Sequence, residues 1–326
     1  MIGLFLVLLV SFLVTYLSIP WFLPRLRNAG IVGMDMNKEG RPEVPEMGGL
    51  AIIGGFILGV LSAIALTTFH LVDFRVDLTL VLASLSTVLI MAVIGLVDDL
   101  LLLKQHIKAL LPLFASLPLV AVRAGVTYMD LPFVGVVEFR FLYPLLLVPL
   151  AITGASNATN MLAGFNGLEA GLGVVMCATV GVIAYLNGST EAVILSFAML
   201  GALLAFLRYN WFPARILMGD IGTLTIGAVV AASVITGNIE RVGIILIIPF
   251  FFELLLKFRG RFKEQSWCGL RAGKLVCDKK GQVYGLGRLV MHYSGGIGER
   301  NLVLCLVSIE VVFALIAFAS MVFHLF

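Results

Sequence analysis

Long apolar segments separated by short polar ones run through this chain and restrict what it can fold into. A helix that crosses a bilayer needs about 20 mostly apolar residues. Stretches of that kind occupy residues 1–23, 48–69, 77–97, 107–122, 141–157, 170–187, 192–208, 221–237, 242–257 and 301–325. Only 13% of the residues are charged, against about 25% in average soluble chains. The sequence therefore predicts an all-α, polytopic membrane protein with about ten transmembrane helices.

The placement of basic residues predicts the orientation of these helices. One set of loops carries 18 of the 22 Lys and Arg residues, and the opposite set carries 4. Basic residues remain on the cytoplasmic side, so both termini are expected outside. The cytoplasmic loops are then those at about 24–47, 98–106, 158–169, 209–220 and 258–300. Alternating runs around residues 278–281 predict a β-hairpin in the last loop, and residues 1–326 are expected to form a single membrane domain.

An asparagine-rich segment interrupts the apolar pattern at residues 154–171, which read GASNATNMLAGFNGLEAG. Its amides at Asn157, Asn160 and Asn166 can donate and accept hydrogen bonds without net charge. Its glycines allow the backbone to approach a ligand closely. The segment is therefore either a plain polar loop between two helices or part of a binding site.

Carboxylates and arginines lie at the ends of the apolar segments on the same predicted face. Adjacent Asp98 and Asp99 diverge by about 100° on a helix, so they cannot face one partner symmetrically. They suit divalent metal binding or proton handling, or they mark a polar helix end. Asp220, between two glycines, is either a ligand or a helix N-cap. Arg259 and Arg261 are either interface anchors or a clamp for phosphate oxygens.

Together these groups indicate phosphoryl transfer. Mg²⁺ takes few protein oxygens and completes its shell with substrate phosphates and water. Carboxylates for Mg²⁺ combined with Lys and Arg for phosphate are typical of phosphoryl-transfer sites. The membrane setting implies that at least one substrate is a lipid.

Three motifs carry a resemblance to a known family. GLVDDLLLLKQHIKALLP, NATNMLAGFNGLEAG and RYNWFPARILMGDIG occur in the order in which they occur in the polyprenyl-phosphate N-acetylhexosamine-1-phosphate transferases. The resemblance covers nearly the whole chain. It implies ten transmembrane helices with both termini outside, and an active site on the cytoplasmic face.

The asparagine-rich motif and the last loop separate branches of that family. Bacterial members of peptidoglycan synthesis typically carry DGxDGLA and a histidine-rich last loop, whereas this chain reads AGFNGLE at 163–169 and RGR at 259–261. This resembles the eukaryotic and archaeal branch, which transfers N-acetylglucosamine-1-phosphate from UDP-N-acetylglucosamine to dolichyl phosphate. That reaction is the first membrane step of lipid-linked oligosaccharide synthesis for protein N-glycosylation. The short last loop favours an archaeal source.

The resemblance also implies roles for the metal and the catalytic residues. Asn160 and Asp220 would hold Mg²⁺, for which Mn²⁺ could substitute. Lys108 would face the incoming lipid phosphate. Asp98 and Asp99 would lie beside the metal and tune or deprotonate the nucleophile.

A second set of residues would bind the substrates. Asn166 and the backbone around Leu217 would recognise uracil, and Arg259 with Arg261 would clamp the diphosphate. The remaining substrate-binding residues that the resemblance implies are Asn157 and, from a first loop that closes over the nucleotide, Asp35, Asn37 and Glu46.

Two alternatives remain open at this stage. One is an undecaprenyl-phosphate sugar-1-phosphate transferase of cell-wall polymer synthesis. The other is a membrane transporter, a class that places ionisable residues near the bilayer midplane, often on broken helices. Glu310 lies well inside the last apolar segment, whereas Glu253 has a plain partner in Lys257 at i+4.

The expected partners are a UDP-amino sugar, a polyprenyl or dolichyl phosphate and the lipid bilayer, with no nucleic acid, and homodimer formation is left open. The expected location is the cell membrane, or the endoplasmic reticulum membrane for a eukaryotic source.

Overall fold

The computed structural model describes residues 2–72, 74–131, 135–262, 266, 269–277 and 283–322, and most of these residues are helical. Seven helices in this described part are long and apolar enough to cross a membrane. They are α1 (Ile2–Asn28), α2 (Gly49–Thr68), α3 (Leu78–Leu101), α8 (Leu168–Leu186), α9 (Thr190–Asn210), α10 (Asp220–Gly237) and α14 (Glu299–Val322). The prediction of a helical, multi-pass membrane protein is thereby confirmed.

The other three predicted spans fold as interrupted helices. Segment 107–122 forms α4 (Gln105–Leu110), α5 (Pro112–Ala115) and α6 (Leu117–Ala121). Segment 141–157 forms the π-helix η1 (Tyr143–Leu147) followed by α7 (Val148–Met161), and segment 242–257 forms α11 (Glu240–Leu246) and α12 (Ile248–Arg259). Prolines lie in the first turn of α5, α6, η1, α7 and α12. Because proline has no N–H to donate, these positions separate α4, α5 and α6 from one another, η1 from α7 and α11 from α12, while the segments stay apolar.

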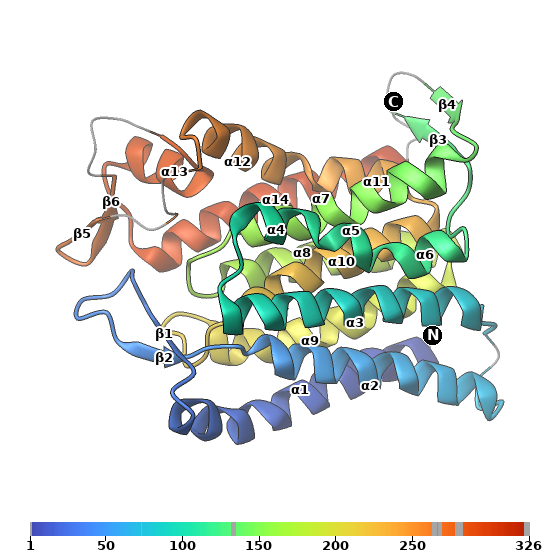
Figure 1. Cartoon of the computed structure of the whole chain (residues 1–326), viewed down its shortest axis with the longest axis horizontal. Helices are drawn as coiled ribbons and strands as arrows, with labels where there is room; N and C mark the ends of the chain where they lie inside the picture. Colours follow the sequence, from blue (N-terminus) through green and yellow to red (C-terminus); the bar gives the residue numbers. More distant parts are fainter. Residues whose placement is uncertain are drawn as a thin grey trace.

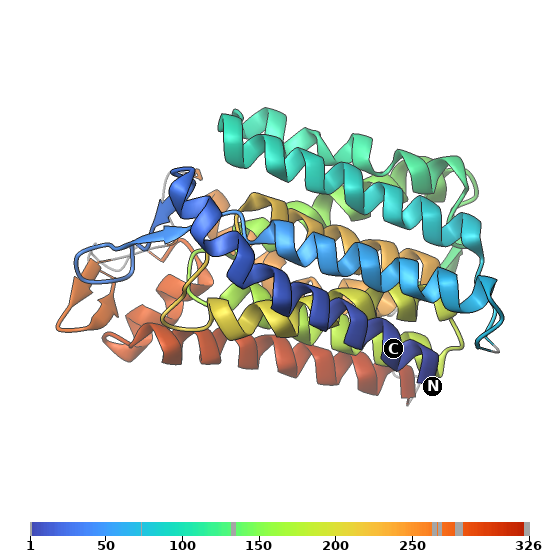
Figure 2. The same ribbon diagram turned by 90° about the horizontal axis from the view of Figure 1, so that it is seen from below.

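Helix α10 forms the centre of the bundle (Figures 1 and 2). Every residue from Ile221 to Gly237 is buried, and α10 packs against α2, α3, α7, α8 and α9. Its first turn approaches its neighbours closely. A Cβ on Gly49 would lie 2.5 Å from the backbone nitrogen of Gly222, and one on Gly95 would lie 2.5 Å from the Cα of Ile221. Glycine thus brings α2 and α3 up to the start of α10.

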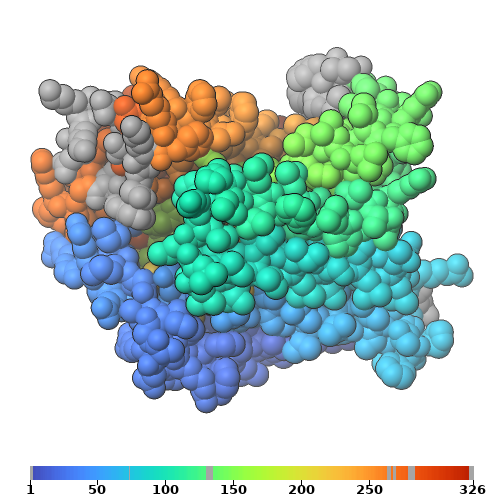
Figure 3. Space-filling model, in the orientation of Figure 1, coloured from blue at the N-terminus to red at the C-terminus, as the bar shows by residue number. Residues whose placement is uncertain are grey.

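The predicted cytoplasmic loops gather at one end of the bundle (Figure 1). This end carries the antiparallel pairs β1 (Val32–Met34) with β2 (Glu43–Pro45) and β5 (Gly269–Arg271) with β6 (Lys274–Val276), and helix α13 (Leu286–Ser294). In the space-filling view the first and last loops lie on either side of a recess beside α4 (Figure 3). The opposite end carries β3 (Tyr128–Leu131), β4 (Gly135–Glu138) and both chain termini (Figures 1 and 2).

A hairpin is present in the last loop, as predicted. It turns at Ala272 and Gly273, where both residues have positive φ. The predicted turn at residues 278–281 lies outside the described residues.

Candidate active site

Lys108 lies between two carboxylates from different helices. Its Nζ is 2.5 Å from Asp98 Oδ2 at the end of α3, and it also forms an ion pair with Asp220 at the start of α10. The other oxygen of Asp98 accepts a hydrogen bond from the Leu103 N–H at 2.9 Å. Asp98 is buried, whereas the Asp220 side chain is 28% exposed. The network therefore has one carboxylate that solvent and a ligand can reach.

Asp99 binds the backbone at the start of α10. Its Oδ1 accepts a hydrogen bond from the backbone N–H of Asp220 at 2.7 Å, and its Oδ2 accepts one from the N–H of Ile221 at 3.1 Å. The divergence predicted for adjacent residues on a helix is thus confirmed. The two aspartates contact different parts of the same neighbour, Asp98 on the side of the ammonium and Asp99 on the side of the helix backbone.

The end of the first loop lies against the segment that leads into α10. Leu217 N–H donates to Pro45 O at 2.8 Å, and Leu217 O accepts from Gly48 N–H at 2.9 Å. Glu46 lies within this pairing, where burial and the charge of Asp220 raise its pKa. Both backbone groups of Leu217 therefore contribute to folding the loop, and its predicted contact with uracil stays a prediction.

A second lysine, Lys38, also lies between two carboxylates. It forms an ion pair with Asp35 Oδ2 at 3.2 Å and another with Glu299 at the start of α14. Asn166 N–H donates to Glu299 Oε1 at 2.8 Å, and Asn166 Nδ2 donates to Asp35 Oδ2 at 3.0 Å. Asn37 Nδ2 donates to a backbone carbonyl in the asparagine-rich loop at 2.6 Å. The predicted residues Asp35, Asn37 and Asn166 are therefore brought together, with Lys38 and Glu299 added.

Helix α7 connects the asparagine-rich segment to both parts of the Lys108 network. Asn157 Nδ2 donates to the carbonyl of Ala109, the residue after Lys108, at 3.1 Å. The hydroxyl of Thr159 donates to Thr223 O in the first turn of α10 at 2.8 Å. Asn160 is the next residue of α7 after Thr159. The hydrogen bond of Thr159 therefore holds the helix turn that carries Asn160 beside α10, which begins with Asp220.

Asn210 connects two of the loops from the end of α9. Its Oδ1 accepts from Gly167 N–H at 3.0 Å, and its Nδ2 donates to Ile216 O at 2.8 Å. Asn210, Lys38 and Glu299 are not among the site residues that the sequence predicts. A polar residue directly at the end of an apolar segment, as in RYNWF for Asn210, was the only signal in the sequence.

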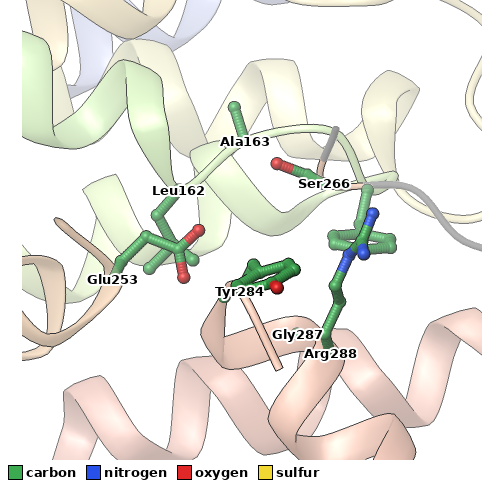
Figure 4. Close-up of a pocket in the computed structure, with 9 residues that line it drawn as sticks. Leu162, Ala163, Glu253, Ser266, Tyr284, Gly287 and Arg288 are labelled. Atoms are coloured by element: carbon green, nitrogen blue, oxygen red, sulfur yellow. The ribbon is translucent and has the colours of Figure 1, made fainter. Parts of the chain in front are cut away.

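Glu253 and Lys257 on α12 face the start of α13 and the end of α7. The predicted i+4 pair is present at 3.4 Å. Glu253 Oε2 accepts from Leu286 N–H at 2.6 Å, and Lys257 donates to the Met161 carbonyl. Figure 4 shows Glu253 and Arg288 on opposite sides of Tyr284 in a small pocket that Leu162 and Ala163 also line.

The two arginines predicted to clamp the diphosphate, Arg259 and Arg261, lie at the exposed end of α12 and just beyond it. The described structure shows no contact between them and the Lys108 or Lys38 networks, and their role stays a prediction. Among the described residues no group of three or more His, Cys, Asp or Glu side chains is placed to hold a metal ion. A cation here would bind through few protein oxygens, and Mg²⁺ accepts that arrangement when substrate phosphates and water complete its shell.

A helical bundle of membrane-spanning length with ionised groups gathered at one end defines a multi-pass membrane protein with a polar site. Residues 80–238 match the model of glycosyl transferase family 4. The matched range contains Asp98, Asp99, Lys108 and Asp220. The chain belongs to this family, and together with the relatives described next this match shows that it is a glycosyl-1-phosphate transferase.

Three relatives illustrate the range of the family. The chain is 36% identical over 313 residues to a protein of Saccharolobus solfataricus, provisionally named UDP-N-acetylglucosamine–dolichyl-phosphate N-acetylglucosaminephosphotransferase, covering 95% of this chain and 94% of the relative. It is 28% identical to the Dictyostelium discoideum protein of the same name, covering 74% and 68%. It is 33% identical to a phospho-N-acetylmuramoyl-pentapeptide-transferase of Halalkalibacterium halodurans, covering 77% and 80%.

Proposed function

We propose that the chain transfers N-acetylglucosamine-1-phosphate from UDP-N-acetylglucosamine to dolichyl or a related polyprenyl phosphate and releases UMP. The names of the archaeal and Dictyostelium relatives support this donor and acceptor. The observation that carries the proposal is Lys108, held between buried Asp98 and partly exposed Asp220. The reaction would be the first membrane step of lipid-linked oligosaccharide synthesis for N-glycosylation.

In the proposed reaction an oxygen of the lipid phosphate forms a bond to the β-phosphorus of the donor. The bond from that phosphorus to the bridging oxygen breaks, and UMP leaves with this oxygen and its electron pair. The product is a lipid diphosphate that carries the sugar. A phosphate dianion is already nucleophilic, so positioning and charge compensation would provide most of the rate. Lys108 supplies a positive charge where the phosphates would meet.

We propose Asp220 and Asn160 as protein ligands of Mg²⁺. Asp220 contributes a partly exposed carboxylate, and the bond from Thr159 to Thr223 fixes the α7 turn that bears Asn160 beside α10. Such hard oxygen donors fit Mg²⁺, and Mn²⁺, which takes the same kinds of ligand, would replace it. When bound, the ion would neutralise charge that develops on the diphosphate. Asp98 would keep Lys108 in place.

A cavity in the other half of the bundle supports a lipid acceptor. It has a volume of about 370 Å³ and lies between η1, α7, α10 and α11. Its lining is apolar apart from Tyr143 and Glu240, and these two side chains form a hydrogen bond with each other. Because α7 and α10 run from this cavity to the Lys108 network, an isoprenoid chain and its phosphate would follow the same helices.

We further propose that the three interrupted segments complete ten crossings, with both termini outside. The loop cluster would then face the cytoplasm from the cell membrane and meet the soluble nucleotide sugar there. The excess of basic residues in these loops supports this orientation. Residues 1–326 would act as one transferase domain.

A turnover assay tests the function directly. Purified protein in detergent would be given UDP-N-acetylglucosamine, dolichyl phosphate and Mg²⁺, with UMP release as the readout and EDTA as a control. Release that requires both the lipid and the metal is expected. Release with undecaprenyl phosphate but not with dolichyl phosphate would favour the bacterial cell-wall reaction instead. No release with either lipid and several UDP-amino sugars would overturn the proposal in favour of a transporter.

A further inference from the structure

We infer that Asp99 is a positioning residue, which fixes the carboxylate of Asp220 for cation binding by holding the first turn of α10. This inference rests on the proposed function, because that proposal makes Asp220 a metal ligand. Under this inference the adjacent residues Asp98 and Asp99 have different roles. Asp98 orients the ammonium of Lys108, and Asp99 orients the helix on which Asp220 is the first residue.

The hydrogen bonds of Asp99 are the first observation. Each of its two oxygens accepts one backbone N–H, from Asp220 at 2.7 Å and from Ile221 at 3.1 Å. The first N–H groups of an α-helix have no partner within the helix. A carboxylate beside them is also favoured by the positive end of the helix dipole. Asp99 thus acts as an N-terminal cap that comes from another helix.

The packing around the cap is the second observation. Gly219 has a φ of 74°, and a Cβ there would lie 2.7 Å from Asp99 Oδ2. A Cβ on Gly95, one helical turn before Asp99 on α3, would meet the backbone of Ile221 at 2.5 Å. Both glycines allow α3 to approach the start of α10 closely enough for the carboxylate to reach two N–H groups.

The cap affects the proposed metal site because Asp220 is the first residue of α10. The N–H that Asp99 holds belongs to Asp220 itself, so the cap fixes the backbone from which that side chain extends. Partners that orient a metal ligand typically change metal affinity by about 10–100-fold when they are removed. Asp99 is therefore expected to act on the metal through Asp220, and not as a base or a ligand.

Mn²⁺ binding to the purified protein without substrates tests this inference, read by electron paramagnetic resonance. Asp99→Leu removes both acceptors, and we expect Mn²⁺ to bind about 10–100-fold more weakly. Asp99→Asn keeps one acceptor oxygen, so its loss should be smaller. Turnover of both variants should recover in part at high Mg²⁺. Equal and complete loss of turnover in both, with Mn²⁺ binding unchanged, would show that Asp99 is a base and overturn the inference.

A second variant tests the same link while Asp99 stays in place. Gly219→Ala puts a methyl group against Asp99 Oδ2 and should weaken Mn²⁺ binding as Asp99→Asn does. Mn²⁺ affinity at the wild-type value in Gly219→Ala, with the protein folded, would contradict the inference.

Asp77 offers a matched control. Its Oδ1 caps α3 by accepting the N–H groups of Thr79 at 2.9 Å and Leu80 at 3.2 Å, at the opposite end of the bundle. Asp77→Ala removes this cap and should lower thermal stability but leave Mn²⁺ binding and turnover unchanged. A comparable loss of Mn²⁺ affinity in this variant would mean that the effect of Asp99 is only a general loss of stability, which would overturn the inference.

Asp220→Ala separates this inference from the proposed function. If Asp220→Ala leaves Mn²⁺ binding unchanged, the proposed metal site is wrong. If it abolishes binding while both Asp99 variants bind as the wild type does, only the positioning role of Asp99 is wrong.

Discussion

The Lys108 and Lys38 networks have the same composition, a lysine between two carboxylates, but different surroundings. Both lysine side chains are 16% exposed. Around Lys38 the carboxylates of Asp35 and Glu299 are 4% and 3% exposed, whereas around Lys108 the values are 4% for Asp98 and 28% for Asp220. One network is closed and the other has an accessible oxygen ligand.

The elements that carry the two networks explain this difference. The Lys38 network joins loops to the start of α14. Asn166 donates its backbone N–H to Glu299 and its side-chain Nδ2 to Asp35, so both carboxylates have a further hydrogen bond. The Lys108 network lies on three helices, α3, α4 and α10. Asp99 on α3 supports it by accepting two backbone N–H groups at the start of α10. The same combination of charges therefore holds loops together in one place and leaves a carboxylate accessible in the other.

The sharpest test of this comparison is Asp220→Ala. We expect turnover to fall by about 10³-fold or more, because charge compensation of that size is typical of groups that bind transferred phosphates. The protein should remain folded, since Asp220 is partly exposed. UMP release and the thermal midpoint measure the two effects. Retained activity at ordinary Mg²⁺ would remove Asp220 from the site.

Lys108→Met should give the next largest effect. Loss of the ammonium removes a positive charge from the place where the phosphates are proposed to meet, and we expect turnover to fall by about 10²-fold. The KM for the lipid phosphate should rise more than the KM for the nucleotide sugar. Steady-state kinetics with each substrate varied in turn would measure this, and equal changes in both KM values would argue against a contact with the lipid.

The matched change in the closed network, Lys38→Met, should act on stability instead. It leaves Asp35 and Glu299 close together without their cation, and breaking a buried pair in this way costs about 3–5 kcal/mol of unfolding free energy. Adding Glu299→Gln should recover part of the loss, because the amide oxygen can still accept the N–H of Asn166. Urea unfolding of the single and double variants would measure this. A normal stability with lost turnover in Lys38→Met would place Lys38 in the reaction.

Features that depend on neighbours along the chain could be predicted from the sequence. The apolar segments, the divergence of Asp98 from Asp99 and the pair of Glu253 with Lys257 all follow from helical periodicity. The prolines that interrupt three of the segments were also visible. Their effect was missed because an apolar window does not register a lost N–H group.

Contacts between distant segments could not be predicted in this way. Lys38 and Glu299 are separated by 261 residues, and Lys108 and Asp220 by 112. Local periodicity says which face of a helix a residue occupies, but not which loop lies opposite it. The resemblance to a family brought Lys108 and Asp220 into one site. Lys38 lies outside the three motifs, and Asn210 lies inside the third one without a role implied for it, so the contacts of both were found only in the structure.

Glu46→Gln should have the smallest effect, and it reports on the buried surroundings of Glu46 next to the Lys108 network. Burial and the charge of Asp220 raise the pKa of Glu46 above its ordinary value of 4.5. The folded state therefore binds this proton more tightly than the unfolded state, and wild-type stability is lost as the pH rises from about 4.5 through the raised value. Glutamine mimics the neutral form and avoids that loss. The thermal midpoint of Glu46→Gln relative to the wild type, measured in EDTA, should rise across this window and then level off, whereas a difference that is constant with pH would show that the surroundings of Glu46 do not raise its pKa.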